Sequence, residues 1–124
     1  IVTLSKGKTP VWLNEGLAQV AEETGDEGRS NRLRMAVADG SVMSLGDLEG
    51  GFTRFDRDQA SLAYSQAYFA AKWLLDHKGG YNVRRLLEAM ATADSTDTAF
   101  RSALGMSYAD VERHMLAALE RSAG

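Results

Sequence analysis

The chain contains no cysteine and only one proline among its 124 residues. Without cysteine it can form neither a disulfide nor a thiolate-bound metal site. An excess of basic residues is also lacking, because 14 Lys and Arg stand against 17 Asp and Glu for a net charge of −3. The basic residues are scattered along the chain, whereas nucleic acids and anionic membranes need a basic stripe. We therefore expect no nucleic-acid partner and no membrane partner. The composition leaves the localisation open.

Long hydrophobic runs are missing as well. The longest apolar stretch, at 68–75, is interrupted by Lys72 and is far below the roughly 20 residues that cross a bilayer. The first eight residues are too short and too mixed in character for a signal peptide. The sequence begins with Ile1 rather than Met, so we expect a fragment of a longer protein. Its length and its 44% of hydrophobic residues predict a single domain over 1–124 with a core of its own.

Helix signals dominate, and a strand signal is confined to residues 1–4. The segment 41–57 is rich in glycine and is expected to be a loop, with one turn at 45–48 capped by Ser44. The expected helices, with the residues that favour their ends, are 10–24 (Thr9, Pro10 and Gly25), 30–38 (Ser30 and Gly40), 58–77 (Gly79 and Gly80), 82–92 (Asn82), 96–104 (Ser95 or Thr96, and Gly105) and 108–121 (Ser107 with Asp110). These signals predict an all-α domain of about six helices around a central long helix.

Two of these helices are the most informative. In helix 10–24 a period of about 100° per residue places the core face on Leu13, Leu17, Val20 and Ala21. Glu15 then lies nearly opposite, beside Val11, Ala18 and Glu22. The helix 58–77 is apolar on two sides and should therefore be central, since it needs neighbours on both sides.

The segment Trp12-Leu13-Asn14-Glu15-Gly16-Leu17-Ala18 is the most specific pattern in the sequence. It resembles the segment that follows the His-Glu-x-x-His helix in gluzincin zinc metallopeptidases, which include peptidase MA-like families. The resemblance implies that Glu15 is the third zinc ligand, and Asn14 could orient its carboxylate or bind substrate. The small side chains at positions 16 and 18 would permit a second helix to approach closely.

A second part of the same resemblance lies at the start of the long helix. The segment 63–68 is similar to the family segment that supplies a tyrosine, whose hydroxyl donates a hydrogen bond to the oxyanion of the transition state. Tyr64 matches best, and Tyr68 is the alternative. The later segments 98–107 and 110–112 resemble the helical tail of peptidase MA-like domains, so that the similarity spans about 9–118.

The sequence departs from the family in its histidines. His77 and His114 are the only two, and neither belongs to a His-Glu-x-x-His motif. We expect His77 to cap a helix end and His114 to lie on the surface. The resemblance places zinc and a peptide or protein substrate in the full-length parent, while this chain alone should bind no zinc and be inactive. The acidic cluster Glu22, Glu23, Asp26 and Glu27 is expected to be solvated.

Other interpretations of these residues stay open. Glu15 could be a solvated helix carboxylate, and Tyr64 could pack in the core with its hydroxyl hydrogen-bonded. The whole chain could be a non-catalytic helical module for interaction or oligomerisation, with self-association through an uncovered face of Val11, Trp12 and Ala18. A His-Glu-x-x-His motif in the coding sequence upstream of Ile1 would favour the enzyme, and its absence would favour the module.

Overall fold

The structure of the chain, a computed structural model, describes residues 9–22 and 28–123. The strand expected at 1–4 and the helix end expected at Gly25 lie outside these residues. Every regular element in the described part is helical: α2 (Val11–Glu22), α3 (Arg29–Asp39), the 3-10 helix η1 (Phe52–Arg54), α4 (Arg57–Thr92), α5 (Thr96–Leu104) and α6 (Tyr108–Ala123). The expected all-α fold is confirmed.

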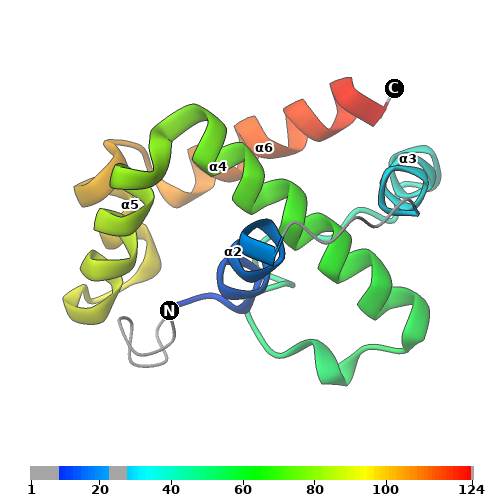
Figure 1. Cartoon of the computed structure of the whole chain (residues 1–124), viewed down its shortest axis with the longest axis horizontal. Helices are drawn as coiled ribbons and strands as arrows, with labels where there is room; N and C mark the ends of the chain where they lie inside the picture. The colour runs from blue at the N-terminus through cyan, green and yellow to red at the C-terminus, as the bar shows by residue number, and fades with distance from the viewer. Residues whose placement is uncertain (1–8, 23–27, 124) are drawn as a thin grey trace.

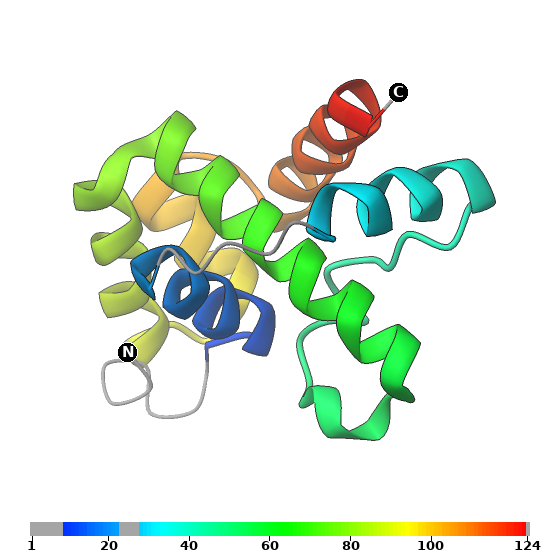
Figure 2. The same ribbon diagram turned by 45° about the vertical axis from the view of Figure 1, so that its right-hand side comes forward.

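Helix α4 is the centre of the arrangement and crosses the whole molecule (Figure 1). It contacts each of α2, α3, α5 and α6. Helix α2 lies across its middle, α5 lies beside its second half, and α3 packs with α6 on the opposite side (Figure 2). The long helix is therefore central, as its two apolar sides predict. None of the described helices combines the length and the apolar character that a membrane span requires.

The two helices expected at 58–77 and 82–92 are both present, and they meet within α4 at a kink at Gly79. Gly79 has φ 83° and ψ 155°, a conformation that only glycine adopts readily. Helical geometry resumes directly after it, so Asn82 is not the N-cap that the sequence predicts. Its Nδ2 instead donates to the carbonyl oxygen of Lys78 at 2.9 Å, inside the continuing helix.

Most of the expected helix ends are correct. Ser95 accepts a hydrogen bond from the amide of Thr98, and Gly105 ends α5 in the left-handed region with φ 72°. Ser107 caps α6 through the amide of Asp110. The 45–48 turn is present, and the Ser44 hydroxyl accepts from the amide of Asp47 at 3.0 Å. Helix α3 also ends at Gly40 as expected, but its N-cap is Gly28 and not Ser30.

The start of α2 differs from the expectation that Thr9 caps it. The amides of Val11 and Trp12 donate to the carbonyl oxygens of Glu49 and Leu48, each at 3.0 Å. The Thr9 hydroxyl is buried and has no partner among the described residues. The free amides of the first turn are thus satisfied by the 45–49 segment, and a side-chain cap at Thr9 is not needed.

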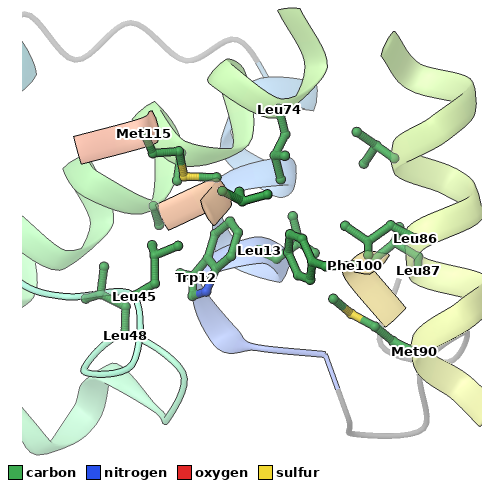
Figure 3. Packing of buried hydrophobic residues seen from close by; sticks show 14 of the residues in the cluster. Trp12, Leu13, Leu45, Leu48, Leu74, Leu86, Leu87, Met90, Phe100 and Met115 are labelled. Carbon is green, nitrogen blue, oxygen red and sulfur yellow. The ribbon is translucent and has the colours of Figure 1, made fainter. Parts of the chain in front are cut away.

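The core is built around Trp12 and Leu13, which are both fully buried (Figure 3). Trp12 lies towards Leu45 and Leu48, and Leu13 lies towards Phe100. The core face predicted for α2 is therefore wrong in part. Its buried residues are Trp12, Leu13 and Gly16, while the predicted positions 17 and 20 are half-buried and position 21 is exposed. The error arises because a glycine adds nothing to an apolar pattern, although it marks the line along which α2 meets α4.

Candidate functional site

The site is organised by the crossing of α2 over α4 at Gly16. A Cβ atom at this position would lie 2.1 Å from the carbonyl oxygen of Ala67 and 2.7 Å from the Cβ of Ala71. Carbon and oxygen atoms that are not bonded cannot approach so closely, so the two backbones meet at a distance that only glycine allows. The small residue at 16 is thus used for contact with α4, whereas the approach expected of a histidine-bearing helix stays a prediction. Ala18, the other small residue, is exposed.

Glu15 precedes this crossing on α2 and is half-buried. Its carboxylate forms no ion pair and no hydrogen bond with any other residue that the structure describes. The opposite result, a carboxylate fixed in a buried ion pair, would have argued against a ligand role.

Asn14, the neighbour of Glu15, has an unusual side-chain environment. Its Oδ1 atom is buried and lacks a hydrogen-bond partner within the described part of the chain. A buried acceptor without a donor costs about 1–3 kcal/mol, so such an atom is normally supplied with a partner. This geometry is compatible with a role in contacting a group that lies outside the described residues.

Tyr64 lies on α4 and is 41% exposed. Its ring packs edge-on against Phe52 of η1, with ring centroids 5.0 Å apart and an interplanar angle of 81°. Tyr68, one turn further on, is half-buried, and the guanidinium of Arg29 lies 3.6 Å above its ring. Of the two tyrosines, Tyr64 has the more accessible side chain, and full burial in the core is excluded for it.

Gln19 connects the two candidate residues. Its Nε2 donates to the carbonyl oxygen of Tyr64 at 2.9 Å and lies 3.4 Å from the carbonyl oxygen of Glu15. The turn of α2 that carries Glu15 and the turn of α4 that carries Tyr64 are consequently neighbours. The segments 12–18 and 63–68 select Glu15 and Tyr64 from the sequence, but neither segment predicts that the two turns are in contact.

Trp12 has a structural role that excludes it from any uncovered face. Its side chain is fully buried, and its Nε1 donates to the hydroxyl of Tyr108 at 2.9 Å. The two rings are stacked, and Tyr108 also packs against Phe100. Burial and a hydrogen bond with Glu49 raise the pKa of the Tyr108 phenol, so this hydroxyl stays protonated. The face of Val11, Trp12 and Ala18 expected to be bare is thus covered at its centre.

The remaining metal-binding side chains are dispersed. No group of three or more His, Asp or Glu side chains that could hold a metal ion occurs among residues 9–22 and 28–123. His77 and His114 are both exposed, and their Nδ1 atoms lie 2.9 and 2.8 Å from the carbonyl oxygens of Trp73 and Asp110. Glu22 is exposed, while the other members of the acidic cluster lie outside the described residues.

Comparison with known protein families identifies a peptidase-like domain. The family model of the Peptidase MA superfamily matches residues 1–120. The chain therefore belongs to the Peptidase MA superfamily. Neither the curated proteins nor the solved structures contain a significant match.

Proposed function

We propose that this chain is the C-terminal helical portion of a zinc-dependent metallopeptidase, in which Glu15 is the third zinc ligand and Tyr64 stabilises the oxyanion. The observation that carries the proposal is the proximity of the two turns across α2 and α4, bridged by Gln19. Two residues that a family resemblance selects independently, 49 positions apart, come to lie on neighbouring turns of packed helices.

Glu15 and Tyr64 have the chemical groups that the roles of zinc ligand and oxyanion donor require. Glu15 offers a carboxylate that no described residue engages, and carboxylate oxygens are ordinary zinc ligands. A catalytic zinc has three protein ligands, so at least one further ligand must come from residues outside those described here. Zinc held in part by Glu15 would supply Lewis-acid activation of water for hydrolysis of a peptide bond. Tyr64 is 41% exposed, and its hydroxyl would donate a hydrogen bond to the oxygen on which negative charge develops.

Asn14 is assigned to the surroundings of Glu15. Its Oδ1 is buried without a donor among the described residues, and we assign Asn14 to orienting the Glu15 carboxylate or to binding substrate. The isolated chain has no His-Glu-x-x-His motif and therefore lacks the general-base glutamate. We expect it to bind no zinc tightly and to be inactive, with a peptide or protein as the substrate of the parent.

The test uses the longer protein, extended at its N-terminus by the residues encoded upstream of Ile1. Glu15→Gln should reduce zinc stoichiometry and abolish turnover, because the amide is a much weaker ligand. Tyr64→Phe should leave zinc stoichiometry unchanged and lower kcat by about 100-fold. Glu22→Gln is the matched control, since it removes an exposed carboxylate from the same helix. Unchanged zinc content and turnover in both site variants would refute the proposal.

The alternative, a non-catalytic module for interaction or oligomerisation, is weakened by the packing of Trp12. Only Val11 and Ala18 of the expected face keep accessible surface, and Val11 is half-buried. Sedimentation of the isolated chain tests this alternative directly. A concentration-dependent dimer that Ala18→Glu disrupts would favour it.

A further inference from the structure

We infer that Gln19 is a positioning residue that holds the turn of Glu15 against the turn of Tyr64. This inference rests on the proposed function. Gln19 lies one helical turn after Glu15, and its Nε2 makes the bond of 2.9 Å to the carbonyl oxygen of Tyr64 together with the longer one of 3.4 Å to that of Glu15. A single amide group thereby connects the backbone of both site residues.

The bridge is directional, which distinguishes it from simple packing. Both partners are carbonyl oxygens, so position 19 must carry a donor, and a glutamine amide provides two N–H groups. A glutamate of the same shape would present only acceptors to two carbonyl oxygens. The geometry therefore selects for a donor at this position and not merely for a side chain of suitable size.

The contact between Gly16 and α4 lies close to the hydrogen bond that Gln19 makes with Tyr64. Gly16 allows α2 to touch α4 at Ala67, three residues after Tyr64. This contact sets the separation of the helices at the crossing, and the Gln19 bond lies one turn further along α2. The Gln19 bond adds a contact on this interface that resists rotation of α2 about the crossing point, beside the buried packing of Trp12 and Leu13. Rotation would move Glu15 relative to the Tyr64 hydroxyl, and a misplacement of about 1 Å in a catalytic group can lower a rate by about 100-fold.

The experiment compares donor and non-donor variants in the longer protein. Gln19→Met keeps the approximate length of the side chain and removes the donor, whereas Gln19→Lys keeps a donor. We expect Gln19→Met to lower kcat by about tenfold, with KM within about twofold of the wild type and zinc stoichiometry unchanged. Gln19→Lys should retain most of the rate. Asn82→Ala is the matched control, because it removes a side-chain amide bond to a carbonyl oxygen on the same long helix outside the site.

Amide hydrogen exchange in the 124-residue chain gives a measurement that does not require activity. The backbone amides of 64–68 and 19–22 should exchange faster in Gln19→Met than in the wild type and remain protected in Gln19→Lys. Unchanged exchange, an unchanged kcat in Gln19→Met, or equal losses in the Met and Lys variants would each overturn the inference.

Failure of the proposed function is recognised separately. If the longer protein hydrolyses no peptide, or if Tyr64→Phe keeps full turnover, the assignment of Tyr64 fails. The exchange measurement then still decides whether Gln19 holds the two turns together.

Discussion

Replacing Gly16 by alanine should destabilise the protein, although alanine is the better helix former. The new Cβ would lie 2.1 Å from the carbonyl oxygen of Ala67, whereas carbon and oxygen atoms in contact are usually at least about 3.3 Å apart. The two helices must therefore separate locally by about 1 Å. Overpacking of this kind costs about 1–3 kcal/mol, and the gain in helix propensity offsets roughly 1 kcal/mol of it. Because the obstacle is backbone, which relaxes poorly, we expect a net loss of about 2 kcal/mol.

Urea unfolding followed by far-UV circular dichroism and tryptophan fluorescence measures this loss in the isolated chain. A loss of this size corresponds to a fall in Tm of about 8 °C for a domain of this length. Gly80→Ala is the control, because a Cβ at Gly80 meets no atom within 4 Å and the residue lies in a helix. It should be neutral or stabilising by up to about 1 kcal/mol. If Gly16→Ala proved as stable as the wild type, the close approach of α2 and α4 would be refuted.

Three further changes test other parts of the fold. Trp12→Phe removes the donor to the Tyr108 hydroxyl and should lower the free energy of unfolding in urea by about 1–3 kcal/mol. The double variant with Tyr108→Phe should lose less than the sum of the two single variants, because both changes remove the same hydrogen bond. Gln66→Leu removes both hydrogen bonds to the loop before α4 and should cost about 2 kcal/mol, with larger loss of amide protection in that loop than elsewhere. Hydrogen bonds from the Arg101 side chain and the Tyr108 amide lower the pKa of the Asp97 carboxyl below its ordinary value of 3.8. The ionised carboxylate therefore contributes fully to the free energy of unfolding above pH 3.8. This contribution is lost as the pH falls through the lower pKa of the folded state. The free energy of unfolding of Asp97→Asn should therefore be lower than that of the wild type at about pH 6, and the difference should shrink by about pH 2. A difference in free energy that does not depend on pH would contradict the lowered pKa of Asp97.

Predictions that depend on neighbours in the sequence are the ones that the structure confirms most often. Ser95 and Ser107 cap the helices that follow them, and Gly105 ends α5, because each of these bonds joins residues no more than four positions apart. The kink at Gly79 is also visible from the sequence. Its extent is not, since one residue absorbs the change of direction and α4 continues beyond it.

Predictions that need distant partners are less successful. The cap expected at Thr9 is replaced by carbonyl oxygens of Leu48 and Glu49, which belong to another part of the chain. Trp12 is expected on an uncovered face, but Tyr108, 96 positions later, provides both a ring to stack on and an acceptor for its indole N–H. No local pattern contains these contacts. Contacts over long sequence separations, both apolar and polar, therefore determine which face of α2 is buried.

The candidate site illustrates the same limit at the level of function. A family motif is sufficient to select Glu15 and Tyr64, since each lies within a recognisable segment, but neither segment specifies how far apart they are. Gly16 and Gln19 both contribute to that distance, although the first has no side chain and the second is an ordinary polar residue on a helix surface. Glycine permits the helices to touch, and the amide fixes the rotation of one against the other. If catalysis depends on both Glu15 and Tyr64, substitutions at Gly16 and Gln19 should lower turnover without altering either functional group, and a variant that restores only helix stability should not recover the rate.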